Sequence, residues 1–136
     1  MASVLYNAFK EALLNKEHDL SADTINVALI STSDEATVTQ SDTSFTNIAG
    51  GPYGASTAAA ITPVTITSGV FDSSGSPTFS SVAIDASKDV DVLILYNDTT
   101  TTPTADALIC WIDGFTAVTP NGGDITITWG ANIFSL

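Results

Sequence analysis

Apolar and polar positions along the last third of the chain follow the pattern of β-strands. Three segments rich in β-branched and aromatic residues, each bounded by turn residues, span residues 89–97, 107–113 and 123–129. The first two are apolar at both odd and even positions, which predicts central strands covered on both faces. In the third segment Ile125 and Ile127 alternate with polar residues, so we expect this strand to be half exposed.

The beginning of the chain has the helical period instead. Apolar residues recur at i, i+3 and i+4 between Leu5 and Leu13, and Ser3 is a suitable N-cap residue. We therefore expect a helix of about three turns within residues 1–18, packed against a sheet. Residues 24–31 follow as the first predicted strand.

Residues 32–62 have no clear period and predict a long loop or arm. Loops of this length inside a compact domain are commonly functional or ordered by a partner. The alternative is a loop that packs on its own domain through its aromatic residues. We take four of its residues as candidate interface residues: Phe45, Ile48, Pro52 and Tyr53.

Shorter strands are predicted at residues 64–67, 70–72 and 78–84, separated by glycine and proline. Together with the other elements they indicate a mainly β fold, an antiparallel β-sandwich of about seven or eight strands with one N-terminal α-helix. A length of 136 residues is typical of one domain, so we expect a single β-sandwich domain over residues 1–136.

The charge of the chain is strongly acidic, because three lysines stand against fifteen acids for a net charge of −12. Binding to nucleic acid or to an anionic membrane needs many basic residues, so both are disfavoured, whereas a basic partner is favoured. No segment has the length and apolarity of a transmembrane helix, and the N-terminus lacks the pattern of a signal peptide. We therefore expect synthesis in the cytoplasm without export, with which the single cysteine agrees.

The single histidine and the single cysteine offer little for catalysis. His18 follows the predicted helix, and no nucleophile motif accompanies it, so we expect a solvated residue at the helix end. Cys110 lies in a predicted central strand without a nearby cation, which indicates a buried and inert thiol. One histidine and one cysteine are too few for a structural zinc site within the chain.

Carboxylates and tryptophans are the remaining candidates. Asp85, Asp89 and Asp91 are close enough in sequence to gather at one sheet edge and bind Ca²⁺, but they lack EF-hand spacing and solvated acids are the simpler interpretation. Trp111 and Trp129 form either part of the core or a platform for carbohydrate, and the core is favoured, more clearly for Trp111. We therefore expect no catalytic site, no metal and no cofactor, and a protein that is not an enzyme.

Seven segments spread along nearly the whole chain resemble segments of a known protein family. They are residues 5–7, 23–29, 51–53, 92–98, 107–113, 123–129 and 133–136. On these segments the chain resembles the decoration proteins of tailed bacteriophages, also called cement or head-stabilising proteins. The resemblance implies a non-enzymatic virion protein, often trimeric, that binds the outer surface of an icosahedral capsid. There it would contact the major capsid protein and clamp neighbouring capsomers against the pressure of the packaged DNA.

The resemblance also implies a location on the virion after synthesis in the host cytoplasm. It transfers no catalytic residue, because that family has no catalytic motif. Two alternatives stay open at this point. One is another phage structural subunit, from the tail tube or the neck, and the other is a sandwich that binds or hydrolyses carbohydrate through Trp129 and clustered aspartates.

Overall fold

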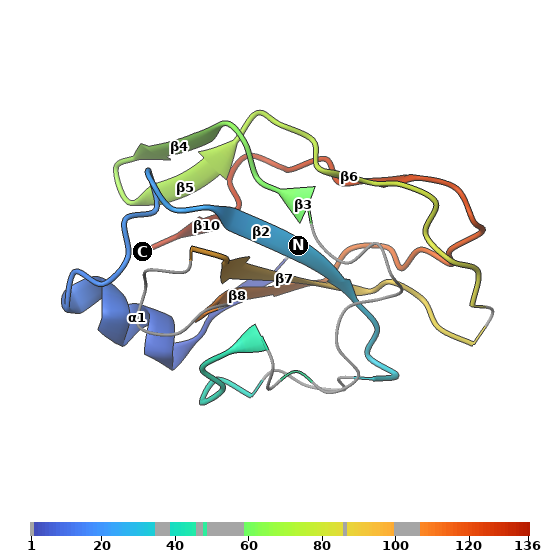
Figure 1. Cartoon of the computed structure of the whole chain (residues 1–136), viewed down its shortest axis with the longest axis horizontal. Helices are drawn as coiled ribbons and strands as arrows, with labels where there is room; N and C mark the ends of the chain where they lie inside the picture. The colour runs from blue at the N-terminus through green and yellow to red at the C-terminus, as the bar shows by residue number, and fades with distance from the viewer. Residues whose placement is uncertain (1, 35–38, 46–47, 49–58, 86, 100–106) are drawn as a thin grey trace.

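The computed structural model of the protein describes residues 2–34, 39–45, 48, 59–85, 87–99 and 107–136. Over these residues the chain forms ten β-strands and one short α-helix, and every strand pairing is antiparallel (Figure 1). This confirms the predicted mainly β sandwich with one N-terminal helix, although the strands are shorter and more numerous than the sequence pattern suggested.

A five-stranded sheet forms the centre of the molecule, in the order β1-β8-β7-β2-β3. The bounds of its strands are β1 Ala2–Leu5, β8 Ala107–Asp113, β7 Val92–Asn97, β2 Ile25–Ile30 and β3 Ala59–Ala60. Every residue of β7 is buried, and so is every residue of β8 except Asp113. Successive side chains of a strand point to opposite faces, so the prediction of central strands covered on both faces is confirmed.

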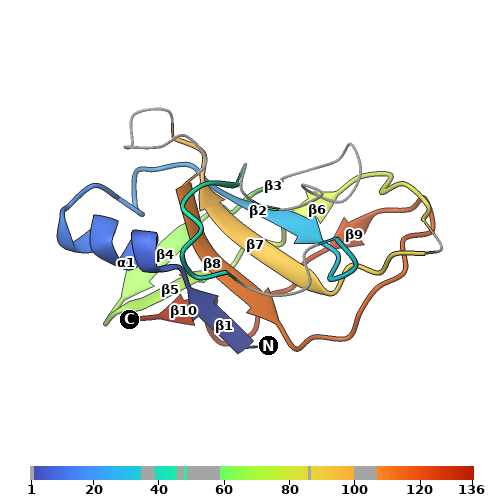
Figure 2. The ribbon, with the colours of Figure 1, turned by 90° about the horizontal axis from the view of Figure 1, so that it is seen from below.

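Two smaller sheets lie on one face of the central sheet (Figures 1 and 2). One is three-stranded in the order β10-β5-β4, and the other pairs β6 with β9. Their bounds are β10 Phe134–Ser135, β5 Val70–Ser73, β4 Val64–Thr67, β6 Thr78–Phe79 and β9 Ile125–Thr126. β4 is an outer edge of its sheet, and three of its four residues are exposed.

The strands predicted at residues 78–84 and 123–129 form regular pairs over only two residues each. Ser81 has a positive φ of 54°, which ends the extended conformation there. The two segments nevertheless stay side by side, because the backbone of Val82 makes hydrogen bonds with Gly122 and Gly123. Beyond β9, Ile127 is buried and Thr128 is exposed, so the expected half-exposed face is confirmed.

The helix begins later than the sequence predicted. Residues Ala2–Leu5 form β1, which pairs with β8, and α1 spans only Asn7–Leu14. Ser3 is therefore not the N-cap; that position belongs to Tyr6, whose backbone N–H donates to Ile109 of β8 over 3.1 Å. The edge of β8 provides partners that an isolated helix lacks, and tertiary pairing outweighs the helical period. Along the described ranges no helix is long and apolar enough to cross a membrane.

An aromatic cluster joins the helix to the three-stranded sheet. The ring of Phe134 stacks on Phe71 of β5 at 4.8 Å and meets Phe9 of α1 edge-on at 5.8 Å. All three side chains are buried, and each contributes about 1.5–3 kcal/mol by leaving water. Figure 2 shows α1 and the C-terminus together at one end of the molecule, where this cluster holds them.

Both tryptophans lie in the core, as favoured from the sequence. Trp111 of β8 is almost fully buried, and its indole N–H donates to the carboxylate of Asp113 over 3.1 Å. Trp129 is 9% exposed, and its indole N–H has no hydrogen-bond partner within the part of the chain that the structure describes. Neither ring therefore forms a flat exposed platform.

Candidate functional site

The turn after α1 folds His18 back under the helix. Lys16 adopts a positive φ of 61°, and the N–H groups of Lys16 and Glu17 donate to the carbonyls of Leu13 and Ala12. This pair of bonds is a Schellman motif, with Lys16 at the position that glycine usually occupies. The chain reverses there, and the side chain of His18 becomes 1% exposed, with its ring 5.4 Å from that of Phe9. The expectation of a solvated histidine was therefore wrong, because the reversal carries the ring under α1.

Asn97, the last residue of β7, fixes the orientation of the imidazole. The Asn97 side chain is fully buried, and its Oδ1 accepts a hydrogen bond from the backbone N–H of Thr99 over 2.8 Å. Its Nδ2 therefore carries the two protons that it donates to Oδ2 of Asp23, over 2.6 Å, and to Nδ1 of His18, over 2.9 Å. Because Nδ1 accepts a hydrogen bond from Asn97, the neutral imidazole carries its own proton on Nε2.

The surroundings of His18 favour this neutral form. Burial lowers the pKa of His18 below its ordinary value, and the carboxylates of Asp23 and Glu17 oppose this effect without cancelling it. Nδ1 of His18 and Oδ2 of Asp23 are 3.9 Å apart, so Asn97 bridges the two side chains. The three residues form a polar cluster, the His18–Asn97–Asp23 cluster, at the end of the apolar strand β7.

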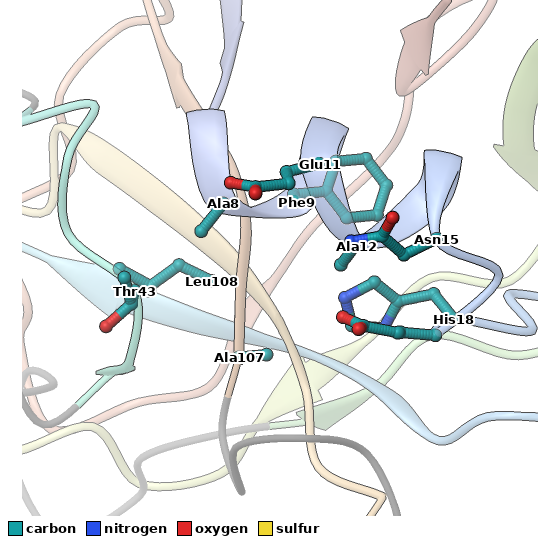
Figure 3. Close-up of a pocket in the computed structure, with 10 residues that line it drawn as sticks. Ala8, Phe9, Glu11, Ala12, Asn15, His18, Thr43, Ala107 and Leu108 are labelled. Carbon is teal, nitrogen blue, oxygen red and sulfur yellow. The ribbon is translucent and has the colours of Figure 1, made fainter.

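A pocket of about 250 Å³ opens beside this cluster, between α1 and the central sheet. Its apolar lining comes from Ala8, Phe9, Ala12, Ala107 and Leu108. Glu11 and Glu17 are exposed and contribute carboxylates, and His18 closes one side. Figure 3 shows His18 and Leu108 on opposite sides of the pocket, with the residues of α1 above them.

Among the residues predicted to form an interface, Phe45 and Ile48 are described, and neither lines this pocket. Phe45 is half-buried, and its ring stacks on Tyr96 of β7 at 4.5 Å. Ile48 is buried in the core. Pro52 and Tyr53 lie outside the described residues. The interface at these four residues therefore stays a prediction, while Phe45 and Ile48 also anchor their segment to its own domain.

Cys110 has the environment that the sequence predicted. It is fully buried in β8, and burial raises the pKa of its thiol to about 12. The thiolate, which is the reactive form, is therefore scarce at neutral pH. The prediction of a buried and inert cysteine is confirmed.

The three aspartates considered for calcium each have their own hydrogen-bond partner. Asp85 accepts hydrogen bonds from Ser87, which lower the pKa of its carboxyl group. Asp89 accepts one from Thr119, and Asp91 accepts from the N–H and the hydroxyl of Thr32. Over the residues that the structure describes, no three side chains among histidine, cysteine and acids are placed to hold a metal ion together.

Comparisons with known proteins add no relative to this description. No protein-family model, no curated protein and no solved structure matches the chain. What the site does is therefore inferred from its residues and from the resemblance noted in the sequence.

Proposed function

We propose that the protein is a structural component of a tailed-phage virion, which binds the outer surface of the icosahedral capsid and stabilises it. Its partner is the major capsid protein, and it acts as a homotrimer on the head after synthesis in the host cytoplasm. The proposal starts from the chain-wide resemblance to capsid decoration proteins. It also depends on the environments of the histidine and the cysteine, residue types that act as bases and nucleophiles in many enzymes.

The observation that carries the proposal is the environment of His18 and Cys110, the two most reactive side chains. Both are buried and take part in the packing of the protein's own core. Nδ1 of His18 accepts its hydrogen bond from a buried amide, and no serine, threonine or cysteine hydroxyl or thiol bonds to its ring in the described part of the chain. Cys110 lies in a central strand with a pKa of about 12. Nucleophilic catalysis requires a base within hydrogen-bond reach of an accessible nucleophile. These residues support a binding protein better than a hydrolase.

The charge of the molecule supports a partner with a basic surface. A net charge of −12 speeds association with a positively charged surface and repels nucleic acid. It also keeps a protein that is made in many copies soluble. These properties suit a decoration protein, which is made in many copies, binds an assembled shell and does not contact the genome.

The outer edge of the small sheet supports assembly into an oligomer. Among the described strands, none pairs with the outer side of β4. The strand contains no charged residue, and its Ile66 is 48% exposed. Proteins usually protect such edges with charges, proline or bulges, or cover them with another chain. A closed oligomer that covers β4 is therefore part of the proposal.

Reconstitution tests the proposed function directly. Purified protein is mixed with capsids assembled without it, in both the unexpanded and the expanded form, and the bound fraction is measured by sedimentation. We expect saturable binding and a higher temperature of capsid disruption. Failure to bind either form of the capsid would reject the proposal.

Cryo-electron microscopy of the virion separates the head from the tail. Density for this protein on the outer surface of the head supports decoration, whereas density within the tail tube or the neck would assign it to the alternative structural role. The carbohydrate-binding alternative depends on Trp129, which is buried, and a glycan array measures whether any binding exists.

A further inference from the structure

The pocket beside α1 is acidic at its rim. Glu11 and Glu17 are exposed there, and neither carboxylate makes an ion pair or a hydrogen bond with the described residues. No lysine is among the residues that line the pocket. The site therefore has two negative charges without a counter-charge and an apolar interior that can cover a hydrocarbon chain.

His18 adds a second, independent feature that points to a ligand. Its side chain is almost completely buried, and its ring forms one side of the pocket. Because Asn97 occupies Nδ1, the proton is on Nε2, and Nε2 makes no hydrogen bond to a described residue. The pocket thus contains a hydrogen-bond donor that bonds to no described residue, together with two carboxylates that pair with no described cation.

The size of the pocket limits what it holds. Small-molecule sites usually enclose about 300–1,000 Å³. A pocket of about 250 Å³ is smaller, and one amino-acid residue with a long side chain suits it better than a cofactor. Phosphates and acidic side chains are repelled by the two glutamates. A purely apolar side chain would leave both the imidazole N–H and the carboxylates without partners.

We propose that the pocket binds one lysine or arginine residue presented by a partner protein. The main-chain carbonyl of that residue accepts the hydrogen bond from Nε2 of His18. Its aliphatic stem lies along Ala12 and Leu108, and its cationic group pairs with Glu11 and Glu17. This inference rests on the proposed function, because the basic residue would belong to the capsid surface.

The chemistry of the pocket is tested with a single-residue probe. Acetyl-arginine amide has the carbonyl and the cationic side chain, and acetyl-citrulline amide has the same shape without the charge. We expect saturable changes in the imidazole NMR signals of His18 with the arginine probe and much weaker ones with the citrulline probe. Equal responses to the two probes, or no response to either, would overturn the proposal.

Matched variants locate the binding. Glu11→Gln and Glu17→Gln each remove one negative charge from the rim, and Asp124→Asn removes one from an exposed position in the β6–β9 region while keeping an oxygen for its hydrogen bond from Ser81. We expect each glutamate variant to weaken binding of the arginine probe up to about fivefold, as for an exposed ion pair. The Asp124 variant should bind as the unchanged protein does. A loss of the same size in all three variants would show only an effect of net charge and would overturn the site.

Binding to capsids distinguishes this inference from the proposed function. If the unchanged protein binds the arginine probe but no capsid, the proposed function is rejected, whereas the binding of a basic residue in the pocket is supported. If the double variant Glu11→Gln, Glu17→Gln loses the probe and weakens on capsids, both are supported. If it loses the probe but binds capsids unchanged, the assignment of the basic residue to the capsid is overturned.

Discussion

The side-chain amide of Asn97 donates a hydrogen bond through Nδ2 to Nδ1 of His18, over 2.9 Å, and so ties the end of β7 to the turn that follows α1. The same nitrogen bonds to Asp23, while the amide oxygen accepts from Thr99. One buried residue thus satisfies polar groups of a distant segment, at His18 and Asp23, and of Thr99, two residues after it. Its removal leaves Nδ1 of His18 without its partner in a place that water barely reaches, and Oδ2 of Asp23 keeps, among the described residues, only its hydrogen bond from the backbone of Asp19.

Asn97→Ala is expected to destabilise the fold by about 2–3 kcal/mol, since buried polar groups that lose their partner cost about 1–3 kcal/mol. The measurement is urea denaturation of the variant and the unchanged protein. Asn26→Ala is the control, because Asn26 makes one exposed hydrogen bond, to Asp98, and its loss should cost less than about 1 kcal/mol. Similar losses in the two variants would contradict the role given to Asn97.

The stability should depend on pH through His18. Burial lowers the pKa of His18 in the folded state, whereas Asp23 and Glu17 raise it by a smaller amount. The unfolded state therefore binds the proton more readily, and stability is full above the unfolded pKa of about 6.5 and falls as the pH decreases below it.

This dependence is checked by denaturation from pH 8 to pH 5 and by NMR titration of the imidazole. The variant His18→Gln keeps an oxygen that accepts from Asn97 but has no titrating ring, so its stability should lose this part of the pH dependence. An imidazole that titrates in the folded protein above its ordinary pKa would contradict the neutral cluster.

Lysine-to-glycine substitutions on either side of the end of α1 should have opposite effects. Lys16 has a positive φ, which costs a residue with a side chain about 1–2 kcal/mol, so Lys16→Gly should stabilise the fold by a net ~0.5–1 kcal/mol. Lys10 lies within the helix, where glycine is about 1 kcal/mol worse than a good helix former. Lys10→Gly should therefore destabilise it. Thermal denaturation of both variants gives the comparison, and a loss in both would refute the strain at Lys16.

Cys110 should resist thiol reagents while the protein is folded. With a pKa of about 12, the folded thiol has far less thiolate than an exposed one, and the core also excludes the reagent. We expect reaction with a chromogenic disulfide at pH 8 to be at least roughly a hundredfold slower than in denaturant. A comparable rate in both conditions would place the thiol at the surface.

Ile66 should contribute to the oligomer if β4 is covered by a second chain. Ile66→Lys places a charge on the uncharged edge strand and should shift the protein towards the monomer, as measured by light scattering coupled to size exclusion. Thr67→Lys adds the same charge to β4 but does not test the same position. Ile66 pairs with the buried Phe71, whereas Thr67 pairs with Val70. A trimer that persists in the Ile66 variant would require another interface.

The central strands could be predicted from the sequence because their signal is local. Val92 to Asn97 and Ala107 to Asp113 are apolar on both faces, and a continuous apolar run of this length has few alternatives to a covered strand. The start of the chain was harder to predict. Leu5 fits both a helical and a strand period, and the choice depends on pairing with Cys110, which no local pattern reveals.

The pocket could not be predicted for the same reason. His18 is buried because Lys16 takes a conformation that usually needs glycine, and a lysine gives no sign of it. Asn97 is recognisable in sequence only as a polar residue at the end of an apolar strand. Asp23 and His18, its partners in the cluster, lie 74 and 79 positions away in the sequence, so the cluster appears only when the fold is known.

The strand order β1-β8-β7-β2-β3 also governs how the chain folds as it is made. β2 pairs with β7, and β1 pairs with β8. Each of these two early strands is therefore synthesised well before its main pairing partner. Pairings between distant segments make folding slow compared with helical proteins of similar size. On the ribosome, β2 therefore emerges as an apolar strand without its main pairing partner, and chaperones that hold such segments should raise the yield of the protein.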